Sequence, residues 1–140
     1  MNSEKEMKEI LLSAKTIAAV GLSSNPAKES FGIVQYLKDQ GYKIIPVNPG
    51  ATEIMGEKAY PDLSSIPESV DVVQVFRKPE DVPPVVDEAI KIRAKVVWMQ
   101  EGIVNEEAAQ KARDAGLQVV MDACMRVMHR QLIGPKPMRI

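Results

Sequence analysis

The chain has 140 residues, 45% of them hydrophobic, and a formal net charge of −1 from 18 Lys and Arg against 19 Asp and Glu. This length suits a single domain over residues 1–140 and excludes a cofactor domain joined to a separate substrate domain. One Cys and one His exclude redox pairs and Cys/His metal sites, and the balanced charge provides no positive field for nucleic acid.

The first predicted element is a helix within residues 1–14. Ser3 and Glu6 have the spacing of a capping box, and Met7, Ile10 and Leu11 form one apolar stripe. Charged and apolar residues alternate here, which is not the pattern of a secretion signal. No apolar run in the chain approaches the roughly 18 residues of a membrane-spanning helix. We therefore expect a cytoplasmic protein that contacts neither membranes nor nucleic acid.

Strands and helices alternate along the rest of the chain. Short apolar runs predict strands over residues 16–20, 43–47, 70–76, 95–99 and 117–121. Apolar spacing and caps predict helices over residues 29–40, 80–93 and 105–115, then a short helix from about residue 126 and a flexible tail over 133–140. Residues 51–69 predict a polar connection with weak structure. The alternation indicates an α/β fold, a doubly wound, Rossmann-like three-layer sandwich with a mainly parallel five-stranded sheet.

In such a sheet the ligand lies at the carboxyl ends of the strands. The loop at residues 21–28 (GLSSNPAK) follows the first strand and precedes a helix, whose unpaired N–H groups favour a phosphate. Lys28 would add a positive charge. Alternatively, Gly21 permits a tight turn and the loop hydroxyls cap the helix. The loop by itself does not decide between these interpretations.

Dinucleotide sites of this architecture usually combine G-x-G-x-x-G with an acidic residue at the end of the second strand. Here the loop has one glycine, Gly21, and Asn48 and Pro49 follow the second strand. NAD binding is therefore the less favoured nucleotide function. The phosphate-binding pattern G-x-x-x-x-G-K-[ST] is also absent from the sequence.

Four blocks of the chain together resemble one known family. They are VGLSSNPAKESFGIVQYLKDQGYKIIPVNP (20–49), VDVVQVFRKPEDVPPVVDEAI (70–90), VVWMQEGI (96–103) and AGLQVVMDACMRVMHRQL (115–132). In this order they resemble the stand-alone coenzyme A-binding domain proteins, which are similar to the N-terminal domain of the succinyl-CoA synthetase α subunit. The resemblance implies a Rossmann-like fold that binds coenzyme A.

The resemblance also implies a set of site residues, each at the carboxyl end of a predicted strand. Those expected near the CoA phosphates are Gly21, Leu22, Ser23, Ser24, Asn25 and Lys28. Asn48 and Pro49 would lie against the adenosine portion. Those expected along the pantetheine path are Val75, Phe76, Arg77, Met99, Gln100, Glu101 and Gly102. Arg77 suits an anion through two parallel hydrogen bonds, but a surface ion pair with Glu80 or Asp81 is the favoured interpretation.

The family likeness implies binding without catalysis. The synthetase uses a phosphorylated His in a second domain, which this chain has no room to encode. His129 and Cys124 match no catalytic position, and we expect both to be structural. We therefore expect noncovalent binding of CoA or a short acyl-CoA, with no catalytic residue and no metal. The alternatives are an NAD(P)-binding oxidoreductase-like protein, a thiol-redox regulator using Cys124, and a CoA-binding subunit that docks on a separate catalytic chain. A homodimer is also open.

Overall fold

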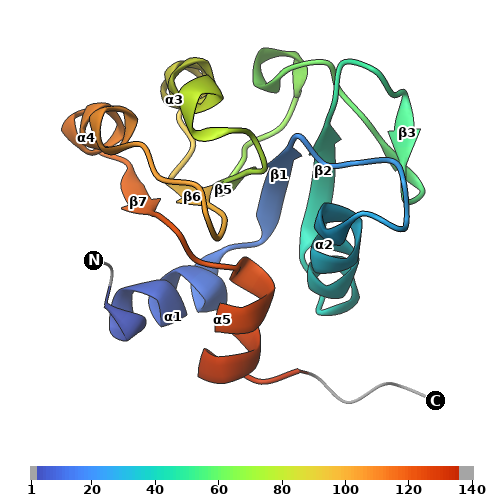
Figure 1. The fold of residues 1–140 in the computed structure, drawn as a ribbon, viewed down its shortest axis with the longest axis horizontal. Coiled ribbons are helices and arrows are strands. Elements are labelled where there is room, and N and C mark those ends of the chain that lie inside the picture. Colours follow the sequence, from blue (N-terminus) through green and yellow to red (C-terminus); the bar gives the residue numbers. More distant parts are fainter. Residues whose placement is uncertain (1–2, 136–140) are drawn as a thin grey trace.

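A five-stranded parallel sheet forms the centre of the molecule in the computed structural model, which describes residues 3–135 (Figure 1). Its order is β2-β1-β5-β6-β7, and every neighbouring pair is parallel. The strands are β1 (Thr16–Val20), β2 (Lys43–Val47), β5 (Val72–Val75), β6 (Val96–Met99) and β7 (Gln118–Val120). The predicted α/β fold with a parallel sheet is confirmed.

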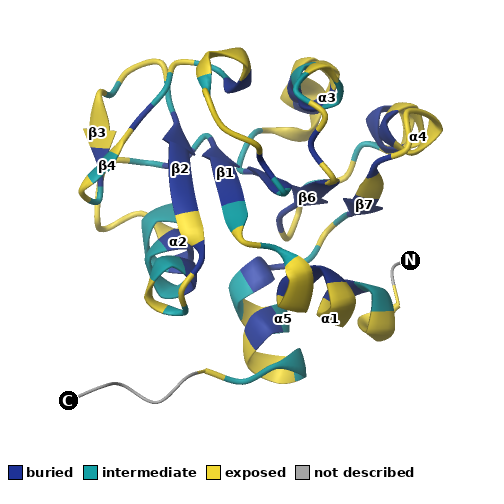
Figure 2. Ribbon diagram, turned by 180° about the vertical axis from the view of Figure 1, so that it is seen from behind, coloured by how far each residue is buried: buried dark blue, intermediate teal, exposed yellow. Residues whose placement is uncertain are grey.

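Helices cover both faces of this sheet (Figures 1 and 2). One face carries α1 (Glu4–Ser13), α2 (Glu29–Asp39) and α5 (Met125–Leu132), whose buried residues share one core cluster. The other face carries α3 (Val82–Lys91) and α4 (Glu106–Asp114), which belong to a second cluster. No helix within residues 3–135 is long and apolar enough to cross a membrane.

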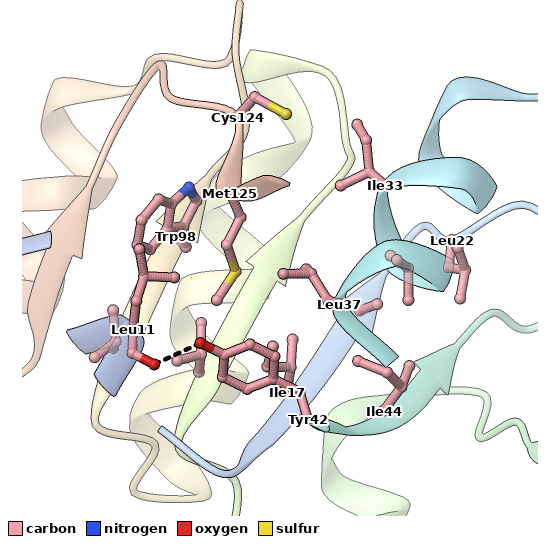
Figure 3. Packing of buried hydrophobic residues seen from close by; sticks show 14 of the residues in the cluster. Leu11, Ile17, Leu22, Ile33, Leu37, Tyr42, Ile44, Trp98, Cys124 and Met125 are labelled. Atoms are coloured by element: carbon pink, nitrogen blue, oxygen red, sulfur yellow. Dashed lines mark hydrogen bonds between the residues drawn. The ribbon is translucent and has the colours of Figure 1, made fainter. Parts of the chain in front are cut away.

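The strand residues divide alternately between these two clusters. Ile17 and Ala19 of β1 face the side of α1, α2 and α5, whereas Ala18 and Val20 face the opposite side. Trp98 of β6 lies fully buried on the first side, among residues drawn in Figure 3. Because both faces are covered, most strand residues are apolar at successive positions and do not alternate with polar ones, as is typical of parallel sheets.

The structure refines two predicted segments. The strand expected over residues 70–76 is shorter, and the helix expected over 80–93 is a 3-10 turn (Pro79–Asp81) followed by α3. Pro83 and Pro84 lack an N–H donor and fit only the first turn of an α-helix, so α3 begins at Val82.

The connection at residues 51–69 contains a small hairpin, β3 (Glu53–Ile54) with β4 (Glu57–Lys58), and a 3-10 helix (Leu63–Ser65). The hairpin turn has positive φ at Met55 and Gly56 (47° and 79°), as a tight two-residue turn requires. The short helix predicted near residue 126 is α5. Of the predicted tail, residues 136–140 lie outside the described part of the chain.

Asp71 joins the amino ends of neighbouring strands. Its Oδ2 accepts hydrogen bonds from the backbone N–H groups of Lys15 (2.9 Å) and Thr16 (3.0 Å). Its Oδ1 lies 3.4 Å from Lys95 Nζ. Burial raises the pKa of the carboxyl, but the two backbone donors and the Lys95 ammonium together outweigh burial and leave the pKa below its usual value.

Asp71→Ala is expected to lower the free energy of unfolding by about 2 kcal/mol at pH 7, because two backbone donors lose a charged acceptor. A lowered folded-state pKa stabilises the protein fully above the unfolded value, near pH 4, and this stabilisation disappears as the pH falls through the folded value. Urea unfolding at several pH values measures the difference between the two proteins. A gap that stays constant from pH 7 to pH 3 would contradict the assignment.

Candidate functional site

The strand order reverses direction at β1. The chain passes from β1 to β2 on one side and then returns to β5 on the other side. Parallel sheets of this type bind ligands in the crevice at that reversal, outside the carboxyl ends of the strands. A pocket of about 290 Å³ lies there. Its lining residues are Gly21, Glu29, Ser30, Ile33, Phe76, Arg77, Gln100, Glu101, Ile103 and Cys124. We call it the switch-point pocket.

The structure brings part of the predicted site together in this pocket. The predicted residues that line it are Gly21, Phe76, Arg77, Gln100 and Glu101. Leu22, Val75 and Met99 do not line it, since their side chains are fully buried. Gly102 is also outside the lining, and its N–H donates to Asp122 Oδ1 (2.6 Å).

At Gly21 the loop after β1 packs closely against the loop after β5. Its φ is +86°, and a Cβ built on it would lie 2.7 Å from the carbonyl oxygen of Phe76. Backbone hydrogen bonds join Gly21 N to Val47 O (3.0 Å) and Phe76 N to Val20 O (2.9 Å). Only glycine fits this conformation and this separation.

The loop at residues 21–28 is held mainly by its own hydrogen bonds. Ser30 Oγ accepts from Ser23 N, Ser23 Oγ from Asn25 N, and Asn25 Oδ1 from Ala27 N. Ser24 and Lys28 are exposed. No side chain caps α2 at Lys28, so its first turn still presents N–H groups beside the pocket.

Asn48 links the end of β2 to the same loop through a side-chain hydrogen bond. Its Nδ2 donates to Leu22 O (3.0 Å), and its Oδ1 accepts from Gly50 N (2.7 Å). Neither Asn48 nor the exposed Pro49 lines the switch-point pocket. A dinucleotide site needs a carboxylate at the end of the second strand to bind the ribose. This chain has the Asn48 amide at that position, and the amide is hydrogen-bonded to the backbone.

The favoured sequence interpretation of Arg77 was wrong. Within residues 3–135, Arg77 forms no ion pair with Glu80, Asp81 or any other acid. The two acids lie in the 3-10 turn and α3 cap, whereas Arg77 Cδ approaches Gly21, 3.4 Å from the place of a Cβ. Arg77 therefore lines the switch-point pocket together with the acids Glu29 and Glu101, and an arginine there can bind an anion through two parallel hydrogen bonds.

Gln100 is held in place by a buried partner that the sequence analysis missed. Gln74 is fully buried in β5, and its Nε2 donates to Gln100 Oε1 (3.0 Å). The same oxygen accepts from Met125 N (3.0 Å) at the start of α5. Both hydrogen bonds use Gln100 Oε1, so they fix the side chain of Gln100 at the edge of the pocket. The single polar residue Gln74 in the apolar run VVQVF (72–76) was the available signal.

The sequence analysis also missed Glu29, Ser30, Ile33 and Ile103 as lining residues. Glu29, Ser30 and Ile33 lie in the first two turns of α2. Their spacing (i, i+1 and i+4) places them on one side of the helix, and this pattern could have predicted that this side faces the loop at residues 21–28. Cys124 is 8% exposed, and its sulfur points toward the Ile33 side of α2 (Figure 3).

The coenzyme A-binding domain family model matches residues 15–130, a span that contains every loop of the switch-point pocket. The chain belongs to this family. The predicted resemblance to coenzyme A-binding domain proteins is thereby confirmed. The matched region begins just before β1 and the Gly21 loop, and it ends within α5.

The chain is similar both to small proteins and to parts of long ones. The chain is 45% identical to the YneT protein of Bacillus subtilis over 91% of this chain and 94% of YneT. A solved hypothetical protein from Pyrococcus horikoshii is 41% identical, with a TM-score of 0.92 over 95% of this chain and 94% of that one. The ADP-forming acetate–CoA ligase II of Archaeoglobus fulgidus is 39% identical over 70% of this chain but only 15% of the ligase.

Proposed function

We propose that this protein binds CoA, or a short acyl-CoA, noncovalently in the switch-point pocket and catalyses no reaction by itself. The observation that carries the proposal is the pocket at the β1/β5 strand reversal of a chain that belongs to a coenzyme A-binding family. Of the groups named by the resemblance, the backbone of Gly21 and the side chains of Phe76, Arg77 and Gln100 line this pocket.

The chemistry of the site suits the separate parts of CoA. A volume of about 290 Å³ is near the lower end for ligand pockets, which fits the narrow pantetheine arm and leaves the nucleotide outside. The pantetheine amides and hydroxyl can pair with Gln100 and the carboxylate of Glu101. The phosphates would then lie toward the uncapped end of α2, with Lys28 and Arg77 as cations.

The position of His129 supports a role without catalysis. It is 4% exposed, and its Nδ1 lies 2.8 Å from Tyr36 Oη. Its ring also packs edge-on against Tyr36 and Tyr42. The imidazole that would serve as a general base does not line the switch-point pocket. When the protein is mixed with acetyl-CoA, ADP and phosphate, we expect no ATP; its formation would overturn the non-catalytic part of the proposal.

Calorimetric titration tests the binding itself. We expect a micromolar dissociation constant for CoA and no heat with NAD. Absence of CoA binding at saturating concentration would overturn the proposal, and tight NAD binding would favour an oxidoreductase-like protein.

Lys28→Ala should weaken CoA binding several-fold but leave the binding of unphosphorylated pantetheine unaffected, because only CoA carries the phosphates. The control is Lys91→Ala, at the exposed carboxyl end of α3. Equal losses of affinity for CoA and for pantetheine would show that Lys28 does not contact the phosphates.

A second candidate is a CoA-binding subunit that docks on a separate catalytic chain. The match to 15% of an ADP-forming acetate–CoA ligase supports it, since the related region is one part of a larger enzyme. Size-exclusion chromatography of native extract distinguishes the two. Elution of the protein with a larger chain would favour the subunit, and elution as a monomer or homodimer would favour the free binding protein.

A further inference from the structure

A second and larger cavity adjoins the switch-point pocket. Its volume is about 520 Å³, and it lies between α1, α5 and the loops that follow β6 and β7. Glu101 and Cys124 line both cavities, so the two meet at these residues. A ligand whose end reaches Cys124 in the first cavity therefore comes up to a residue that also lines the second. We call the second the acyl cavity.

Apolar side chains form much of the wall of the acyl cavity. They are Met7, Val104, Met121, Ala123, Val127 and Met128. Val104 is 43% exposed and Val127 is 37% exposed, although both are apolar, and both line this cavity. Apolar surface gathered in a hollow marks a binding site more often than scattered exposure does. Three methionines also give the wall flexible side chains that adjust to ligands of different length.

The charged groups at this cavity are mostly negative. Glu4, Glu101, Glu106 and Asp122 face one cation, Arg113. Carboxylates at the wall repel a ligand that brings another carboxylate into a partly desolvated space. The cavity therefore suits a neutral apolar group and disfavours a terminal carboxylate.

We propose that the acyl cavity binds the neutral, apolar acyl chain of an acyl-CoA whose pantetheine arm occupies the switch-point pocket. This assignment rests on the proposed function, because it needs CoA in the first pocket. It adds a preference among thioesters: straight aliphatic acyl chains bind more tightly than acetyl, and dicarboxylic acyl groups such as succinyl bind less tightly than their neutral counterparts.

A calorimetric series tests the preference with CoA, acetyl-CoA, butyryl-CoA, hexanoyl-CoA and succinyl-CoA. Burial of a methylene strengthens binding by about fourfold, so we expect butyryl-CoA, which has two more methylenes, to bind about 16-fold more tightly than acetyl-CoA, and hexanoyl-CoA still more tightly. Succinyl-CoA should bind at least tenfold more weakly than butyryl-CoA. If CoA binds but affinity does not rise with chain length, the acyl cavity is wrongly assigned while the proposed function stands. If CoA does not bind, both fail.

Two variants locate the effect in the acyl cavity. Val127→Asp, in the first turn of α5, should abolish the gain from acetyl to hexanoyl and leave CoA affinity within twofold. Leu12→Asp is the matched control, because Leu12 is 63% exposed on α1 and does not line this cavity. Glu106→Gln should narrow the gap between succinyl-CoA and butyryl-CoA. A chain-length gain that survives Val127→Asp, or that is lost equally in Leu12→Asp, would overturn the assignment.

Discussion

Gly21→Ala is expected to lower CoA affinity by about 100-fold or more and to cost about 2 kcal/mol of unfolding free energy from backbone strain. The added Cβ would lie 2.7 Å from the Phe76 carbonyl oxygen, a backbone atom that cannot rotate away. One of the two loops must therefore move, and both line the switch-point pocket. Calorimetry with CoA and urea unfolding measure the two effects.

Gly116→Ala is the matched control for this substitution. Gly116 has a similar positive φ of +92°, but its Cβ would have no neighbour within 4 Å. It follows α4, and does not line the pocket. We expect this variant to be destabilised by strain and to bind CoA normally. Comparable losses of affinity in both variants would show that strain, and not the approach of Gly21 to Phe76, causes the loss of binding.

Trp98→Ala is expected to lower the free energy of unfolding by about 4 kcal/mol, the range for a large aromatic side chain deleted from a core. Trp98 is fully buried in β6 and packs among residues from α1, α5 and neighbouring strands (Figure 3). Chemical denaturation monitored by circular dichroism measures the change, since the variant has no tryptophan fluorescence. A loss below about 1 kcal/mol would contradict the packing described for this residue.

Trp98→Phe separates packing from hydrogen bonding. The indole Nε1 donates to Ala123 O (2.8 Å), and Ala123 precedes Cys124, which lines both cavities. Phenylalanine keeps most of the apolar volume and removes the donor, so we expect a folded protein with weaker CoA binding. Unchanged binding in a folded Trp98→Phe variant would show that this hydrogen bond does not position the Cys124 segment.

The strands and the edge of the sheet that carries the switch-point pocket could be predicted because both follow from local patterns. A run such as residues 16–20, covered on both faces, is apolar at almost every position, and the following Gly21 indicates a turn. The rule for parallel sheets then places the ligand at the strand ends. Phe76, Arg77 and Gln100 reach the switch-point pocket for this reason.

The remaining site residues depend on contacts between distant segments. Arg77 precedes two acids in sequence, so a local ion pair was the natural expectation. In the structure its side chain lies beside Gly21, which comes from a distant part of the chain. Gln74 and Gln100 are 26 residues apart and meet only because β5 and β6 are neighbours. Cys124 enters the pocket through the packing of α5 against α2. No periodicity within one segment encodes these arrangements.

The contacts of Asp71 lie at the amino ends of the strands, whereas both cavities lie beyond the carboxyl ends. A four-residue strand separates the two edges by roughly 13 Å. Substitutions at the Asp71 edge can therefore change how firmly the sheet is held without touching any ligand-lining group. For protein engineering, this division allows stability and the lining of the cavities to be changed in separate rounds, with additive effects expected between sites so far apart.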